Sequence, residues 1–223
     1  MAQVELLERG DLYFLYTPRV RPGGALPLRL DDGLIRLRDV QRLYLVLRPE
    51  GKVAYRRLLV GRKRMPDPER RQRYWVEIER VERSASAVLR DLRRFEYETK
   101  TRGRRVQPAA KPAGEGVYAL LRHESHSHLS YRLTEPRSPL QLQQALGILP
   151  RASYIAAAFN PEAPPRLGRR PPDVAVSPSV LRQSFGDKRF APLDPDLLDV
   201  EGLELVLIGT SSTAGETGIE RWH

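Results

Sequence analysis

Residues 42–60, RLYLVLRPEGKVAYRRLLV, contain two apolar β-type runs on either side of Pro49-Glu50-Gly51. Proline presets the φ angle that the first central position of a turn requires, and glycine accepts the left-handed conformation that closes a turn. The stretch therefore predicts a β-hairpin that pairs Arg42–Arg48 with Val53–Val60.

Similar short runs recur on both sides of this hairpin. A second hairpin is predicted from Val117–Arg122 and His128–Leu133. Further strands are predicted at Asp11–Thr17, Tyr74–Ile78, Phe95–Lys100, Ser153–Phe159 and Leu203–Ile208. Local hairpins favour antiparallel pairing, because parallel strands need long crossover connections.

The expected helices are few and short. They are Ser86–Arg94, a helix from Ser138-Pro139 to Gly147, a helix from Ser177-Pro178 to Gly186, and a turn at Asp194-Pro195. Serine before proline marks a helix start, and glycine marks a helix end. The sequence thus predicts an α+β fold, a mainly antiparallel β-sheet built from hairpins with a few short helices.

Two stretches rich in glycine and proline are predicted to be loops. Thr101–Gly116 is expected to be a flexible basic arm, or a linker that divides the chain into two subdomains. Asn160–Val174 contains five prolines and is expected to form a polyproline-II strap. Residues 1–223 otherwise predict a single compact domain.

The composition excludes several classes of protein. Hydrophobic residues make up 40% of the chain, charged residues 30%, and cysteine is absent, which excludes disulfides and thiolate sites. Glu5, Glu8 and Asp11 stand where a signal peptide needs basic and apolar residues, and the apolar runs are too short to cross a bilayer. We expect a cytoplasmic bacterial protein without membrane contact. Nucleotide-binding and hydrolase motifs are absent, so no cofactor is predicted.

Positive charge is concentrated between Gly51 and Lys111, where 19 Lys and Arg residues accompany 8 Asp and Glu residues. The whole chain has 38 Lys and Arg residues and 28 Asp and Glu residues, so the net charge of the chain outside this segment is close to zero. Arginine supplies 33 of the 38 cations, but a general arginine bias would spread them evenly along the chain. Their concentration in one segment predicts a surface that attracts polyanions.

The candidate polyanion-binding residues form three clusters. Arginine suits this role because its guanidinium group matches phosphate oxygens with two parallel hydrogen bonds. Four aromatic residues lie between the clusters: Tyr74, Trp75, Phe95 and Tyr97. Exposed aromatic rings would stack on bases, but the alternation of apolar and polar residues along these strands indicates that most of the four belong to the core. The clusters are Arg56, Arg57, Arg62, Lys63 and Arg64; Arg70, Arg71 and Arg73; and Lys100, Arg102, Arg104 and Arg105.

Three of the four histidines, His123, His126 and His128, fall within six residues. Histidine is a common zinc ligand, so a metal site is one interpretation. If the apolar residues of both strands face the core, however, Arg122 lies opposite His128, and the other two histidines belong to the turn. We therefore expect a solvated polar hairpin and no bound metal, with the three-histidine site as the weaker alternative.

Three function classes are consistent with these features. The first is a binding protein that contacts a polyanion, with RNA or DNA as the expected ligand, through the basic segment 51–111. The second is an enzyme that clamps a phosphorylated or carboxylated small molecule with arginine and uses His123, Glu124 or His126 as acid or base. The third is an adaptor for an acidic protein. An open basic surface would favour the first or third class, and a closed pocket the second. We expect a binding protein rather than an enzyme.

Overall fold

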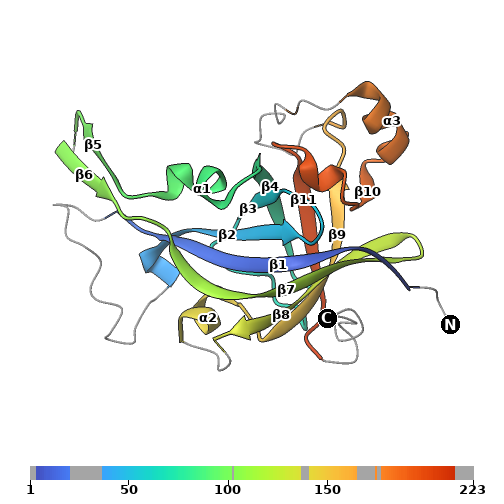
Figure 1. Ribbon diagram of the computed structural model, residues 1–223, viewed down its shortest axis with the longest axis horizontal. Coiled ribbons are helices and arrows are strands. Elements are labelled where there is room, and N and C mark those ends of the chain that lie inside the picture. The colour runs from blue at the N-terminus through green and yellow to red at the C-terminus, as the bar shows by residue number, and fades with distance from the viewer. Residues whose placement is uncertain are drawn as a thin grey trace.

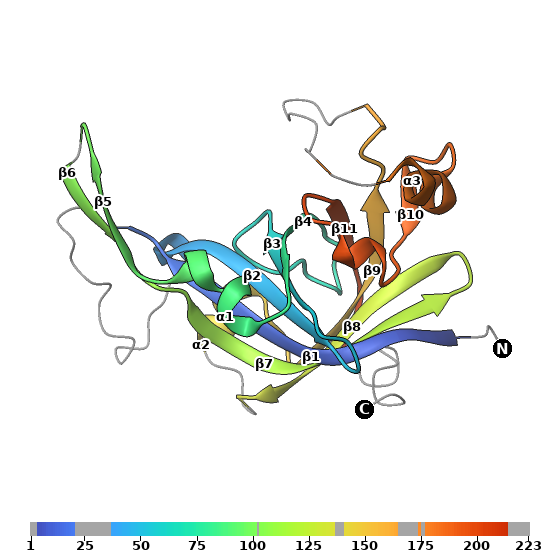
Figure 2. The same ribbon diagram turned by 45° about the horizontal axis from the view of Figure 1, so that its top comes forward.

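A computed structural model describes residues 4–20, 37–101, 103–136, 141–164, 174 and 177–213. Strands account for 53% of the described residues and helices for 15%, and eight strands close into a β-barrel (Figure 1). The predicted α+β class is therefore wrong, while the predicted antiparallel β structure is confirmed. The helices are short segments on the outside of the barrel (Figures 1 and 2).

The barrel strands follow the order β9-β11-β4-β3-β2-β1-β7-β8, and antiparallel pairing of β8 with β9 closes the ring. A two-stranded hairpin of β5 and β6 projects beyond one end of the barrel (Figures 1 and 2). A short strand, β10, pairs with the end of β9. The strands are β1 (Val4–Pro18), β2 (Val40–Pro49), β3 (Tyr55–Val60), β4 (Arg73–Glu82), β5 (Phe95–Thr99), β6 (Gly103–Gln107), β7 (Lys111–His123), β8 (His126–Glu135), β9 (Arg151–Phe159), β10 (Phe190–Pro192) and β11 (Glu204–Ser211).

Side chains fill the barrel interior. In β1, Leu12, Phe14 and Tyr16 are buried and alternate with half-buried residues, because successive side chains of a strand point to opposite faces. The ring of Phe14 meets that of Tyr131 from β8 edge-on, with centroids 5.1 Å apart. An eight-stranded barrel has just enough interior for its side chains to fill, and here they form one hydrophobic cluster.

The predicted hairpin at Pro49-Glu50-Gly51 is confirmed. β2 and β3 pair antiparallel, from Leu43 opposite Val60 to Leu47 opposite Arg56. Gly51 has a φ of +74°, the left-handed conformation expected from its place in the turn. The second strand begins at Tyr55, two residues later than predicted.

A short helix and a 3-10 helix replace the single helix predicted at Ser86–Arg94. α1 (Ala85–Val88) begins after Ser84, whose side chain accepts a hydrogen bond from the backbone N–H of Ala87, and η4 (Arg90–Leu92) follows. The side chains of Val88 and Leu92 are buried beneath this segment. α1 packs on the outside of the barrel against β3 and β4.

The other helices agree with their predicted ends where these are described. α3 (Pro178–Phe185) has Ser177 as its N-cap and Gly186 as its C-cap, as predicted, and η5 (Leu197–Asp199) follows Asp194. α2 (Gln141–Leu146) ends at Gly147, but its predicted N-cap, Ser138, lies outside the described residues. In the described part of the chain, none of the helices has both the length and the apolar content needed to cross a lipid bilayer.

The predicted loop at Thr101–Gly116 is wrong. Its residues form β6 and the first part of β7, which pairs with β1. Gly116 serves close strand packing instead of flexibility, because a Cβ atom there would lie 2.1 Å from the carbonyl oxygen of Arg132. Most of the predicted strap at Asn160–Val174 lies outside the described residues.

Candidate polyanion-binding groove

Arg56, one of the predicted polyanion-binding residues, is fully buried at one end of the barrel. Its guanidinium group donates hydrogen bonds to Glu8 Oε1 at 2.5 Å, to Asp199 Oδ1 at 2.7 Å and to the carbonyl oxygen of Pro195 at 3.2 Å. The Tyr118 hydroxyl donates to the same Glu8 oxygen at 2.7 Å. Burial works against the charged form of Arg56, but these carboxylates more than offset it and raise its pKa. Arg56 is therefore a structural residue that a ligand cannot reach.

Arg57 is fully buried on the outside of the barrel, beneath α1 and η4. It donates to Glu79 at 2.8 Å, to the carbonyl oxygen of Val88 at 2.5 Å, and to both carboxylate oxygens of Asp91 at 2.7 and 2.8 Å. Its guanidinium carbon lies 5.6 Å from the centre of the Tyr44 ring. The hydrogen bond from Arg57 lowers the pKa of Asp91. Arg57 thus attaches the α1–η4 segment to the barrel and does not face solvent.

Two hollows that share Gln41 lie along one face of the β5–β6 hairpin, with volumes of about 610 and 430 Å³. We call them together the basic groove. Among its described lining residues Asp91 is the one carboxylate, and that carboxylate is bound to Arg57. The cations that line the groove are Arg19, Arg42, Lys63, Arg90, Arg93, Arg94 and Arg105. Both hollows are open to solvent, so the groove accepts an extended ligand.

The β5–β6 hairpin presents two different faces. Phe95 pairs with Gln107 and Tyr97 with Arg105, so these four side chains share the face that lines the groove. Glu96 and Glu98 point to the other face, together with Arg104. Most of the four aromatic residues between the basic clusters were predicted to belong to the core, but Phe95 is 50% exposed and Tyr97 37% exposed, so these two do not.

The remaining predicted cations are scattered. Lys63 and Arg105 line the groove, although Arg105 is only 9% exposed. Arg104 is paired with Glu96 on the opposite face of the hairpin. The others lie elsewhere on the described surface: Arg62 over the Tyr74 ring, Arg64 beside Gly147, Arg70 paired with Asp67, and the exposed side chains of Arg71, Arg73 and Lys100. Arg102 lies outside the described residues.

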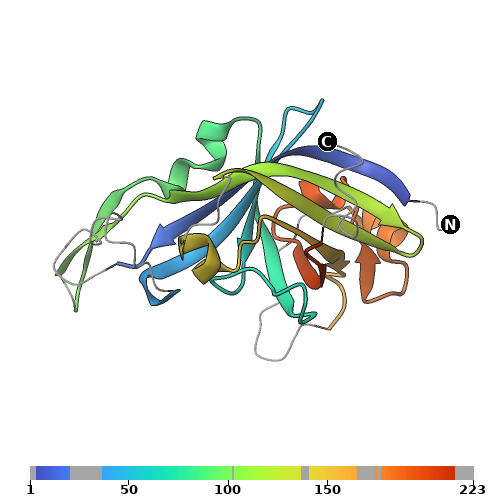
Figure 3. The ribbon, with the colours of Figure 1, turned by 90° about the horizontal axis from the view of Figure 1, so that it is seen from below.

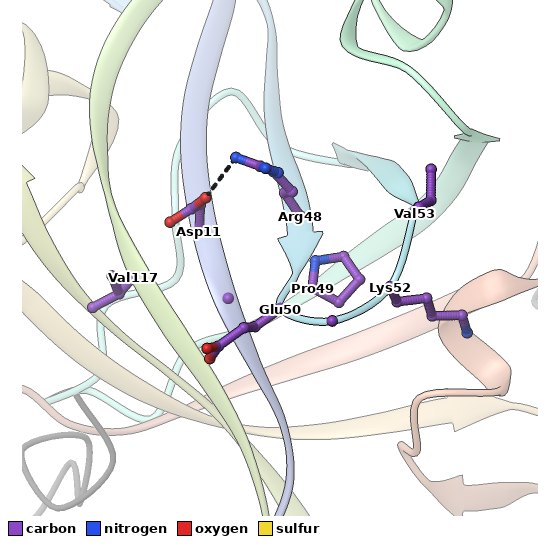
Figure 4. A pocket seen from close by; sticks show the side chains of 9 residues that line it. Asp11, Arg48, Pro49, Glu50, Lys52, Val53 and Val117 are labelled. Carbon is purple, nitrogen blue, oxygen red and sulfur yellow. Dashed lines mark hydrogen bonds and ion pairs between the residues drawn. The ribbon is translucent and has the colours of Figure 1, made fainter.

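A further hollow, of about 500 Å³, surrounds the β2–β3 turn but has balanced charges. Arg48 donates to Asp11 at 3.2 Å across it (Figure 4), and Arg9 pairs with Glu50 at 2.5 Å. Lys52 on its rim pairs with Asp199. Because its acidic and basic residues balance, this hollow provides a comparison surface for the basic groove, where Arg42 pairs with Glu79 and Arg94 with Glu96 but the described lining has an excess of cations.

The histidines lie on the β7–β8 hairpin, at the opposite end of the barrel from β5 and β6 (Figure 3). Leu121 pairs with His128, and His123 with His126, so the predicted pairing of Arg122 with His128 is wrong by one residue. Apolar side chains occupy both faces of β7, where Leu120 faces the main core and Leu121 a smaller outer cluster. The apolar alternation therefore does not define the register.

In the observed register, the three imidazole rings lie together, contrary to the prediction. Their centroids are 5.3 Å apart for His123 and His126, 6.2 Å for His123 and His128, and 4.9 Å for His126 and His128. Burial lowers the pKa of His128 to about 4, and the neighbouring rings add to this shift. Within the part of the chain that the structure describes, no group of three His, Cys, Asp or Glu side chains is arranged to hold a metal ion. Absence of metal stays a prediction.

Sequence reasoning missed five of the groove cations: Arg19, Arg42, Arg90, Arg93 and Arg94. A signal for three of them is present in Arg90-Asp91-Leu92-Arg93-Arg94, which was interpreted as the basic end of a helix. Arg19 directly follows β1 and Arg42 lies in the neighbouring strand β2, both outside the basic segment. Only the folded chain brings them to the groove.

Comparison of the chain with protein-family models, with curated proteins and with solved structures finds no significant match in any of the three.

Proposed function

We propose that this protein contacts a polyanion, with RNA or DNA as the expected ligand, through the basic groove. The observation that carries this proposal is the composition of the groove lining, where seven cations accompany a single carboxylate among the described residues. A cleft lined by charges of one sign focuses the electric field and raises the local concentration of a counter-ion ligand.

The shape of the groove supports a polymeric ligand. Its two adjoining hollows are open, whereas an enzyme for a small molecule generally encloses most of its ligand. Arg90 and Arg93 are exposed on its wall, where their guanidinium groups are available for two parallel hydrogen bonds to phosphate oxygens. The cytoplasm is the proposed location, since the chain has no cysteine that an oxidising compartment would use.

Salt-dependent binding tests the proposal. Affinity for a fluorescently labelled nucleic acid should decrease linearly in a plot of log K against log salt concentration, because each neutralised phosphate releases counterions. Arg90→Ala and Arg93→Ala should each lower the affinity and reduce the slope by about 0.7 per lost contact with a single strand. The matched controls are Arg48→Ala, which removes a paired cation from the lining of the balanced hollow, and Arg9→Ala, which removes the partner of Glu50 in that lining.

Two outcomes would contradict the proposal: no binding at low ionic strength, or equal losses in the groove variants and the controls. Poly-glutamate serves as a separate competitor. Poly-glutamate is added so that its carboxylates are as concentrated as the phosphates of the labelled nucleic acid. If it displaces the nucleic acid under this condition, the groove does not distinguish nucleic acid from acidic protein, and an adaptor for an acidic protein replaces the proposed nucleic-acid-binding protein.

A further inference from the structure

Resting on the proposed function, the geometry of the β5–β6 hairpin points to single-stranded nucleic acid as the ligand, with bases stacked on Phe95 and Tyr97. Both rings are substantially exposed, at 50% and 37%, although burial of large aromatic side chains is strongly favourable in water. Each ring lines one of the two hollows of the basic groove. Stacking on a base would cover this apolar surface.

The two rings have a spacing that suits unstacked bases. They stand two residues apart on β5 and therefore on one face of the hairpin, with centroids 5.6 Å apart and planes inclined by 35°. Stacked bases of a duplex rise by about 3.4 Å per nucleotide in each strand. The two rings are in contact with each other at 5.6 Å and form one exposed aromatic surface, on which bases that are not stacked on each other can rest. In a duplex the faces of internal bases are covered by their neighbours, so the rings have no equivalent contact.

Charges on the hairpin direct a strand to the same face. The groove face carries Arg105 beside Tyr97, while both acidic residues of β5, Glu96 and Glu98, point to the opposite face. On that opposite face Glu96 is paired with Arg104, so its charges largely balance, whereas the aromatic face borders the cations of the groove and attracts a phosphate backbone. The hairpin is held to the barrel near its base, where Gln107 Nε2 donates to the carbonyl oxygen of Pro18 at 3.2 Å. The rings and the cations of the groove are thus placed together before a ligand arrives.

The test uses three probes at one low salt concentration: a labelled oligothymidylate 12-mer, a DNA hairpin duplex with a similar number of phosphates, and inorganic polyphosphate. The single strand should bind more tightly than the duplex. Phe95→Ala and Tyr97→Ala should each weaken single-strand binding by about 5- to 150-fold, the range found for loss of one base–aromatic stack. Both variants should leave polyphosphate affinity within about twofold of the parent, since polyphosphate has no bases. Phe190→Ala, which removes an exposed aromatic ring from β10, is the matched control and should change none of the three affinities.

The outcomes separate this inference from the proposed function. If none of the probes binds, the proposed function fails. If polyphosphate and duplex bind as well as the single strand, or if the double variant Phe95→Ala/Tyr97→Ala keeps its single-strand affinity, the groove binds polyanions but the stacking inference is wrong. Circular dichroism of each variant verifies that the barrel remains folded.

Discussion

Replacing Arg56 with methionine should destabilise the protein without removing a ligand contact. The change leaves Glu8 and Asp199 without their shared cation at the end of the barrel, where the Glu8 side chain is only 9% exposed. Removing one partner of a buried ion pair costs about 3–5 kcal/mol. Because Lys52 remains paired with Asp199, we expect the free energy of unfolding to fall by about 3 kcal/mol, near the lower end of this range.

Arg48→Met is the matched control, because Arg48 and its partner Asp11 are 52% and 45% exposed. An exposed pair of this kind contributes at most about 1 kcal/mol. Urea unfolding followed by circular dichroism measures both variants, and the slope m should stay constant. In thermal unfolding, about 3 kcal/mol corresponds to a decrease of about 6–12 °C in Tm for a chain of this length.

Equal stability of the two variants would refute the structural role of Arg56. So would a folded Arg56→Met protein whose nucleic-acid affinity falls more than that of Arg90→Ala, because the result would make Arg56 a ligand residue. If Arg56→Met does not fold, Glu8→Gln tests the same network with a smaller change, since it keeps the size of the side chain and removes one charge. Its unfolding free energy should then also fall below that of the parent.

Two further predictions concern stability. Because Arg57 lowers the pKa of Asp91 in the folded protein, the stabilisation from this pair is present above the unfolded pKa, about 3.9, and is lost as the pH falls below it. The Tm of the parent should therefore decrease between pH 5 and pH 3. Asp91→Asn should lower the Tm at pH 7 and make it depend less on pH between pH 5 and pH 3. An equal dependence of Tm on pH in the variant and the parent would contradict the stabilising role of the Arg57–Asp91 pair. Gly116→Ala should cost about 1–3 kcal/mol or more, because its Cβ atom would lie 2.1 Å from a backbone oxygen that cannot rotate away. Gly114→Ala, whose nearest neighbour is the Gln143 side chain at 3.0 Å, should cost less, and the reverse order in urea unfolding would count against this account.

Features that depend only on neighbouring residues were predicted from the amino-acid sequence. The turn at Pro49-Glu50-Gly51, the start of α3 at Ser177 and its end at Gly186 were all predicted, because turn and cap residues act over three or four positions. The excess of positive charge between Gly51 and Lys111 was also found by counting the charged residues of the sequence. These signals predicted antiparallel hairpins but not how the hairpins combine.

Closure of the sheet into a barrel could not be predicted from the sequence. Closure depends on pairing of β8 with β9, and alternation within one strand carries no information about which distant strand becomes its neighbour. The register of β7 and β8 was mispredicted for a related reason, because both faces of β7 are apolar.

Tertiary structure also decided which cations are available to a ligand. Arg56 and Arg57 are adjacent in sequence and project from opposite faces of β3, and both are buried against carboxylates, of which Asp199 is 143 residues away from Arg56. Arg19 and Arg42 lie outside the basic segment, yet both line the groove: Arg42 lies in β2, and Arg19 follows β1, the strand that pairs with β2. Charge is a property of each residue, whereas burial and pairing depend on the distant segments that the closed barrel places beside it.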